Sequence, residues 1–182
     1  ILDLGCGGGW KLFPNVGYTA GIDATPSAVS KASTIYPQVA LADLRSIPFP
    51  DGVFSVVVSM DALGHIPATD KDLVIREIRR VLKPGGLTVH YIECASDDPL
   101  CQLAKRQGEY DAIYVQPEGH LGLEPPEAVF KRFRDNGFDA IEEREVYRLF
   151  TYTRGFAELL DHGAYRSSGP LRLTQFLCHL LH

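Results

Sequence analysis

Short apolar runs alternate along this chain with stretches in which apolar residues recur every three or four positions. The short runs predict strands at residues 1–4, 18–23, 39–42, 53–59, 87–92 and 138–145. The helical spacing predicts helices at residues 26–36, 69–82, 99–108 and 126–136. Because strands that alternate with helices are typical of parallel βαβ units, the pattern predicts an α/β fold with a doubly wound, mostly parallel sheet.

Residues typical of helix ends support two of these predicted helices. Thr25 followed by Pro26 is typical of a helix start, with proline at the first helical position. Thr69 and Asp72 have the spacing of a capping box, in which each side chain bonds the other residue's backbone N–H. Both helices are therefore expected to begin at a side-chain cap.

The chain divides into two predicted parts. Residues 1–145 contain all the predicted strands and form the predicted core domain. From residue 147 onward apolar residues recur at helical spacing, so residues 146–182 are predicted to form a helical C-terminal extension packed on that core. Because a predicted strand begins at residue 1, we also expect further residues before it in the full protein.

Composition limits the partners that we expect. The chain has 182 residues, of which 45% are hydrophobic, enough for one sizeable core. Its formal net charge of -5 disfavours nucleic acid, and no apolar run approaches the roughly 20 residues that span a membrane. The cysteines show neither a C-x-x-C pair nor zinc spacing, which predicts reduced thiols, no metal site and a cytoplasmic protein; they are Cys6, Cys94, Cys101 and Cys178.

The first predicted strand ends in a glycine-rich turn, "ILDLGCGGGW". Such a turn brings backbone N–H groups close to a ligand. A P-loop would place Gly-Lys-Ser/Thr at the end of the turn, whereas Gly9 is followed by Trp10 and Lys11, so we exclude it. A dinucleotide loop fits Gly5 and Gly7 but needs a small residue where Trp10 stands.

The pattern D-x-G-x-G-x-G, which starts at Asp3, fits a ligand that has a positive centre and no phosphate. S-adenosylmethionine, with its ammonium and sulfonium groups, is such a ligand. Asp3 is expected to attract the ammonium group, directly or through water. Asp23 and Asp43 end the next two predicted strands, where they suit the ribose hydroxyls and the adenine amino group, with Leu44 covering the ring. A helix cap for Asp23 and a turn role for Asp43 are the alternatives, and Asp23 alone would also fit NAD.

These segments resemble the class I S-adenosylmethionine-dependent methyltransferases, in particular the large group that acts mostly on small molecules. The resemblance rests on "ILDLGCGGG", "GIDATPSAV", "ADLRSIPFPDGVFSVVVS", "HI" at 65–66 and "RVLKPGG" at 80–86. It implies a Rossmann-like sheet with the cofactor across the carboxyl ends of its first three strands. Together with the pattern above, it makes the candidate cofactor residues Asp3, Gly5, Cys6, Gly7, Gly9, Asp23, Ala24, Asp43, Leu44 and Ser59.

Two features depart from the family pattern. Ser55 follows Phe54 where the family usually has aspartate, and this position looks structural. Only residues 10–17 separate Gly9 from the second predicted strand, so the first helix is expected to have barely two turns. No final strand is evident after residues 138–145.

The methyl acceptor is expected beyond the fourth and fifth strands, near residues 59–65 and 93–95. His65 and His120 are the candidate catalytic bases, and a packing or hydrogen-bonding role is the alternative for each. Asp61 and Glu93 are candidates for attracting a cationic acceptor, whereas His90 is predicted to be a core histidine. No Asn/Asp-Pro-Pro-Tyr/Phe motif follows the fourth strand, which argues against methylation of exocyclic amines of nucleic-acid bases.

The sequence thus predicts S-adenosylmethionine-dependent methyl transfer, by in-line displacement, to a small molecule of unidentified structure. Oxygen or carbon is the favoured acceptor atom, because no strongly acidic amine pocket is evident. A non-catalytic module that binds S-adenosylmethionine is the alternative, and an NAD(P)-dependent reductase is a further one. The oligomeric state stays open.

Overall fold

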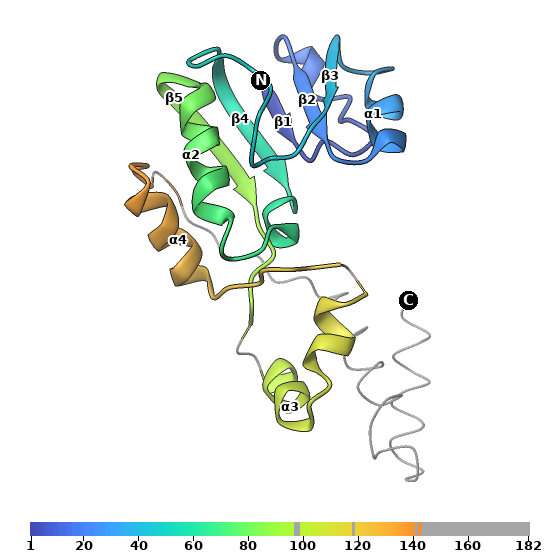
Figure 1. The fold of residues 1–182 in the computed structure, drawn as a ribbon, viewed down its shortest axis with the longest axis vertical. Coiled ribbons are helices and arrows are strands. Elements are labelled where there is room, and N and C mark those ends of the chain that lie inside the picture. The colour runs from blue at the N-terminus through green and yellow to red at the C-terminus, as the bar shows by residue number, and fades with distance from the viewer. Residues whose placement is uncertain (97–98, 118, 141, 143–182) are drawn as a thin grey trace. The chain divides into compact units, whose positions relative to one another are not determined.

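The computed structural model describes residues 1–96, 99–117, 119–140 and 142 (Figure 1). The chain forms two compact units. Unit 1 consists of Ile1–Cys94 and Leu121–Asp139, and unit 2 contains Ala95–His120. The predicted helical extension, residues 146–182, lies outside the described residues.

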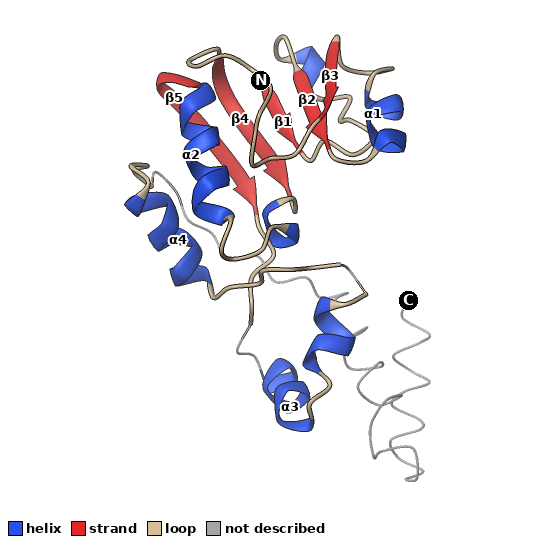
Figure 2. Cartoon of the chain, in the orientation of Figure 1, coloured by secondary structure: helices blue, strands red, loops and turns tan. Residues whose placement is uncertain are grey.

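Unit 1 is built on a five-stranded sheet whose paired strands are all parallel (Figure 2). The strands lie in the order β3-β2-β1-β4-β5. Their bounds are β1 Leu2–Leu4, β2 Ala20–Asp23, β3 Gln38–Leu41, β4 Phe54–Met60 and β5 Leu82–Tyr91. The chain therefore runs outward from β1 to β3 and returns to the other side of β1 for β4 and β5.

Three helices of unit 1 cover this sheet. They are α1 (Pro26–Ala32), α2 (Lys71–Val81) and α4 (Pro126–Asp135). α1 packs against β2 and β3, α2 packs against β5, and α4 packs against α2. Because the crossovers through α1 and α2 run in opposite directions across the sheet, the right-handed connection rule places these helices on opposite faces. The predicted doubly wound α/β fold is confirmed.

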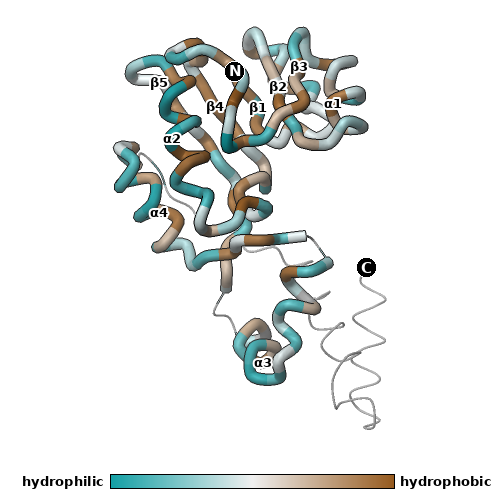
Figure 3. Tube along the Cα trace, viewed as in Figure 1, coloured by the Kyte–Doolittle hydropathy of each residue, from teal (hydrophilic) through white to brown (hydrophobic). Residues whose placement is uncertain are grey.

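The apolar positions of the strands and of α2 form one core. Along α2, hydrophobic and hydrophilic positions alternate with the helical repeat (Figure 3). Its inward side chains meet the apolar strand residues in a cluster that is fully buried at Leu2, Leu4, Ile22, Val57, Val74, Ile78 and Val81. This core fixes the carboxyl ends of β1, β2 and β4 relative to one another.

Unit 2 contributes a short helical hairpin to the described chain. It contains α3 (Pro99–Gln107) and the π-helical turn η3 (Asp111–Val115). Ala104 is buried there and contacts Leu103, Tyr110 and Tyr114. Among the described residues no helix is both long and apolar enough to cross a membrane.

Two predicted elements differ from the structure. The connection between β1 and β2 contains only the 3-10 turn η1 (Phe13–Asn15), because the few residues available leave no room for two helical turns. The strand predicted at 138–145 is absent over residues 138–140, where Phe138 instead donates its N–H to Phe133 as α4 ends. Residues 143–145 lie outside the described part of the chain.

The predicted start of α1, with Thr25 at the cap position and Pro26 after it, is confirmed, but neither helix has the predicted side-chain capping bond. Thr25 occupies the cap position of α1 without a capping bond, and its own N–H donates to the Asp23 carboxylate instead (2.8 Å). α2 begins at Lys71, where Thr69 makes no capping bond, because Arg132 binds the Asp72 carboxylate that the box required. A local bond to Asp23 therefore engages Thr25, and a tertiary contact engages Asp72.

The last strand of the sheet is longer than predicted. β5 begins at Leu82, which pairs with Phe54, and the next pair joins Leu87 to Val56. The Pro-Gly-Gly sequence between them is accommodated by this shift of register. The strand therefore includes residues that the sequence pattern assigned to a helix end.

Candidate functional site

The strand order reverses between β1 and β4, so their carboxyl ends are the candidate ligand site. In open parallel sheets, ligands bind at such a reversal, outside the carboxyl ends of the strands. β1 leads at this point into the glycine loop, and β4 leads into the 3-10 turn η2 (Leu63–His65). Leu4 of β1 pairs with Ser59 of β4, so the ends of the two strands are in register.

The glycine loop depends on backbone conformations that favour glycine. Gly5, Gly7 and Gly9 have φ angles of 61°, 53° and 82°. A Cβ at Gly5 would lie 2.7 Å from the Cβ of Ala62, so this glycine also allows close packing on the segment after β4. A Cβ at Gly7 would meet nothing within 4 Å, so the loop is open to a ligand at its centre.

Asp23 connects the end of β2 to this loop. One carboxylate oxygen accepts the Gly7 N–H (2.9 Å), and the other accepts the Thr25 N–H (2.8 Å). Each oxygen keeps a further lone pair for a ligand hydroxyl. Ala24, the next residue in the chain, is exposed.

Asp3 is buried beneath the loop, with only 2% of its surface exposed. Its carboxylate accepts the Tyr36 hydroxyl (2.6 Å), and the same hydroxyl accepts the N–H of Trp10 (2.7 Å). Burial raises the pKa of Asp3 to about 6, the bond from Tyr36 opposes this, and the nearby charge of Asp23 adds to it. The buried, ionised carboxylate of Asp3 is therefore unfavourable without a positive partner, and a cationic ligand would provide one.

The side chain of Cys6 lies away from solvent in a small apolar cluster. It packs with Ala32 and Tyr36, and only 4% of the residue is exposed. Burial first, and then the charges of Asp3 and Asp23, raise the pKa of the thiol to about 12. Cys6 therefore contributes packing and its backbone to the loop.

Asp43 and Leu44, the residues predicted to bind the adenine, follow the end of β3. Arg45 binds the Asp43 carboxylate through two side-chain contacts (2.6 and 2.9 Å), and these bonds lower the pKa of Asp43. Arg45 also reaches Asp70 (2.8 Å). The Leu44 side chain is buried in the main core cluster, at 7% exposure. Arg45 was not foreseen, although it is only two residues from Asp43.

A chain of hydrogen bonds joins β4 to β5. The Ser59 hydroxyl lies 2.7 Å from His90 Nδ1, and the Thr88 hydroxyl lies 2.5 Å from His90 Nε2. Because the Thr88 hydroxyl donates to the Val57 carbonyl, it accepts from Nε2–H, and Ser59 donates to Nδ1. Burial lowers the pKa of His90 to about 4, so the ring stays neutral. His90 is hydrogen-bonded at both ring nitrogens, as predicted for a non-catalytic histidine, although it is half-buried in a partly exposed strand and not part of the core.

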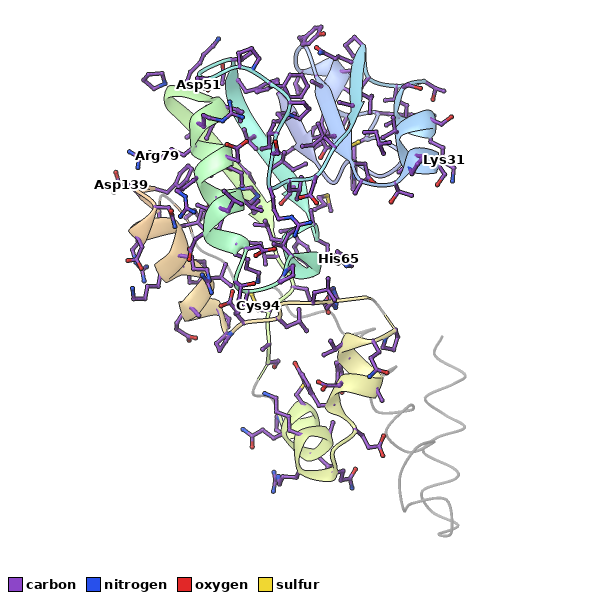
Figure 4. All side chains as sticks on the ribbon, in the orientation of Figure 1. Lys31, Asp51, His65, Arg79, Cys94 and Asp139 are labelled. Carbon is purple, nitrogen blue, oxygen red and sulfur yellow. The ribbon has the colours of Figure 1, made fainter. Side chains whose placement is uncertain are left out.

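The two candidate bases occupy different units. His65 is exposed at the end of η2, beyond the carboxyl end of β4, where Figure 4 labels it. His120 belongs to unit 2, where its N–H donates to the Val115 carbonyl. Tyr36 is the main site residue that the sequence did not reveal, because it follows α1 and contacts Asp3 only through the fold.

The charges of the site discriminate between the possible cofactors. Asp3 and Asp23 lie close enough for one charge to raise the pKa of the other. Two carboxylates beneath one loop repel a diphosphate and attract a cation. The charges of the site residues therefore fit the cationic S-adenosylmethionine better than a diphosphate.

The chain is similar to known methyltransferases. Residues 2–90 match the methyltransferase domain family. The 2-methyl-6-phytyl-1,4-hydroquinone methyltransferase of Synechocystis is 38% identical over 98 residues, covering 49% of this chain and 30% of that protein. The Aspergillus luteorubrus protein named "Probable methyltransferase ltbC" is 30% identical over 172 residues, covering 77% of this chain and 57% of that protein.

Solved structures show the same fold. An S-adenosylmethionine-dependent methyltransferase from Mesorhizobium loti matches with a TM-score of 0.61 and 21% identity, over 78% of this chain and 74% of that one. Residues 2–90 therefore make up a domain of the class I S-adenosylmethionine-dependent methyltransferase family, as the sequence motifs indicated. The chain spans 30% and 57% of the lengths of the two curated relatives above.

Proposed function

We propose that this chain binds S-adenosylmethionine and transfers its methyl group to a small-molecule acceptor. The observation that carries the proposal is the buried Asp3 carboxylate under an open glycine loop, with Asp23 bonded to the same loop. The matched relatives support it, since their names cover carbon, nitrogen and oxygen acceptors of small molecules. For the same reason these names leave the acceptor open.

The proposed roles follow from position. Asp3 attracts the ammonium group, and Asp23 accepts hydrogen bonds from the ribose hydroxyls. Asp43 accepts from the adenine amino group, and Leu44 and Ala24 flank the ring through their backbone. Gly5, Gly7 and Gly9 let the loop lie against the methionine part of the cofactor, next to Ser59.

When bound, S-adenosylmethionine supplies a methyl group on a positively charged sulfur, which is an already activated leaving group. The contribution of the protein is mainly alignment, because an in-line displacement requires the nucleophile, methyl carbon and sulfur to be collinear. The ends of β4 and β5 would hold the acceptor on the side of the loop opposite to β2. A base is needed only where the acceptor carries a proton.

Calorimetry with S-adenosylmethionine and S-adenosylhomocysteine tests the cofactor site. We expect micromolar binding to the wild type and at least a tenfold loss in Asp23→Ala. Asp51→Ala is the matched control, because Asp51 is exposed near the start of β4, at the opposite end of the sheet (Figure 4). Binding of NAD(P) in preference to S-adenosylmethionine would refute the proposal.

Turnover is tested by following S-adenosylhomocysteine formation on a panel of phenols, amines, thioethers and carboxylic acids. The single turn η1, in place of a helix, is the observation that favours a non-catalytic module. Micromolar cofactor binding with no turnover on the whole panel would support that module. Turnover that Asp23→Ala abolishes would support the enzyme.

A further inference from the structure

The segment after β4 contains a strained residue beside the glycine loop. Asp61 has a φ of 62° and is the one non-glycine residue with positive φ in the described part of the chain. Its N–H donates to the Tyr91 carbonyl at the end of β5 (2.9 Å), which holds this backbone conformation. The next residue, Ala62, is the one that packs on Gly5. Strain of this kind is concentrated at functional sites.

The Asp61 carboxylate and the His65 imidazole lie near one another. A carboxylate oxygen of Asp61 and a ring nitrogen of His65 lie within 4.8 Å of one another. One Asp61 oxygen is buried, whereas His65 is exposed beyond β4 (Figure 4). A partly buried carboxylate therefore lies near an imidazole that a substrate can reach.

The turn that carries His65 is hydrogen-bonded to the segment at residues 121–122. The Gly64 carbonyl accepts the N–H groups of Leu121 (3.1 Å) and Gly122 (3.3 Å). A Cβ at Gly122 would lie 2.2 Å from the Ile66 carbonyl oxygen, so only glycine allows this approach. The buried Lys71 in turn donates to the Gly122 carbonyl and pairs with Glu124 (3.2 Å). Turn η2 is therefore part of a rigid scaffold.

We propose that His65 is the base that takes the proton of the methyl acceptor, and that Asp61 is the positioning residue that orients its ring. This inference rests on the proposed function and commits to an acceptor with a hydroxyl group. In the step, the acceptor oxygen forms a bond to the methyl carbon while the carbon–sulfur bond breaks and leaves its electron pair on sulfur. The hydroxyl proton passes to a ring nitrogen of His65, and the charge of Asp61 stabilises the resulting imidazolium.

Nuclear magnetic resonance of the His65 ring tests the pairing without turnover. We expect long-range ¹H–¹⁵N correlations to show one dominant tautomer in the wild type and a mixture in Asp61→Asn. Asparagine tolerates the same left-handed backbone, so this variant changes the charge and keeps the turn. The same mixture of tautomers in both proteins would overturn the pairing.

Kinetics test the base. With the panel phenol that turns over fastest, we expect His65→Gln to lower kcat about 100-fold, and Asp61→Asn about 10-fold, with KM within about threefold. A thioether acceptor, which carries no proton, should show neither loss. Equal losses on both acceptors would overturn the base role.

Calorimetry separates this inference from the proposed function. Both variants should bind S-adenosylmethionine within about twofold of the wild type, because neither residue is proposed to hold it. A wild type that does not bind S-adenosylmethionine refutes the proposed function, whereas the tautomer measurement still decides whether Asp61 orients His65.

Discussion

Replacing Asp3 by asparagine should make the ligand-free protein more stable near neutral pH and weaken its cofactor binding. Asparagine has the shape of a protonated aspartic acid and still accepts the Tyr36 hydroxyl. Asp3 is 2% exposed, and burial raises its pKa from 3.8 to about 6. The folded state therefore binds this proton more tightly than the unfolded state does.

The sign and size of the effect follow from that pKa. A carboxyl group whose pKa is higher in the folded state contributes its stability fully below about pH 4, and this contribution is lost as pH rises through about 6. At 1.36 kcal/mol per pKa unit, the loss is about 3 kcal/mol by pH 7.5, as an upper estimate. Asp3→Asn should match the wild type near pH 4 and exceed it by up to about 3 kcal/mol at pH 7.5. This corresponds to roughly 6–12 °C in Tm.

Cofactor binding should show the opposite dependence. Only the ionised Asp3 attracts an ammonium group, and its ionised fraction rises about tenfold between pH 5 and pH 7. The affinity of the wild type for S-adenosylmethionine should rise by about that factor. The affinity of Asp3→Asn should be weaker and should lack this component of the pH dependence.

Urea unfolding at pH 4.5, 6.0 and 7.5, with calorimetry at pH 5, 6 and 7, checks both expectations. Asp23→Asn is the matched control, because that carboxylate accepts two backbone N–H groups and an amide can satisfy only one. The control should lose about 1–3 kcal/mol and also bind the cofactor more weakly. A stability difference between Asp3→Asn and wild type that is the same at all three pH values would refute the reasoning.

Four further predictions concern the loop, the His90 hydrogen bonds and the Lys71 contacts. Gly7→Ala should weaken cofactor binding and cost about 1–2 kcal/mol in stability. Gly5→Ala should cost more stability, because its Cβ would lie 2.7 Å from the Cβ of Ala62. Calorimetry measures the loss of binding, and urea unfolding measures the loss of stability. Ser59→Ala should cost about 1–3 kcal/mol in urea unfolding at pH 7, because it leaves His90 Nδ1 without a donor. Burial lowers the pKa of His90 to about 4, so the free energy of unfolding should fall as pH drops from 6.5 through 4. Urea unfolding of Asp3→Asn should reveal this slope, because that variant lacks the opposing titration of Asp3. Lys71→Met should cost about 1.5–3 kcal/mol in urea unfolding, because it removes a buried cation that binds the Gly122 carbonyl and Glu124, although Glu124 keeps Arg132 as a partner; a loss below about 1 kcal/mol would contradict this.

The sequence predicted the elements whose pattern is strong and local. The run at 53–59 became β4, Phe54–Met60, because a run of apolar and β-branched residues favours a strand whose side chains reach the core, as Phe54 and Val57 do. The glycine loop was predictable for a similar reason, since three glycines at alternate positions indicate backbone conformations that other residues rarely adopt. Here the residue type itself carries the conformational information.

The sequence-based prediction failed where contacts between distant parts of the chain decide the role of a residue. Arg132, 60 residues away in the chain, binds Asp72 and removes it from the predicted capping box. Leu44 was expected to cover an adenine ring, yet its side chain is part of the main core. In both cases the local pattern was compatible with either role, and packing decided between them.

Tyr36 stabilises the glycine loop, which is followed by only a short connection to β2. Without a long helix, the N–H of Trp10 needs another partner, and the Tyr36 hydroxyl provides it while donating its own proton to Asp3. The end of the loop and the charge of the carboxylate are therefore connected through one hydroxyl group. Because that bond stabilises the ionised form of Asp3, it keeps the pKa of Asp3 below the value that burial alone would give. Tyr36 thus keeps Asp3 largely ionised at neutral pH, which is the state that attracts a cation.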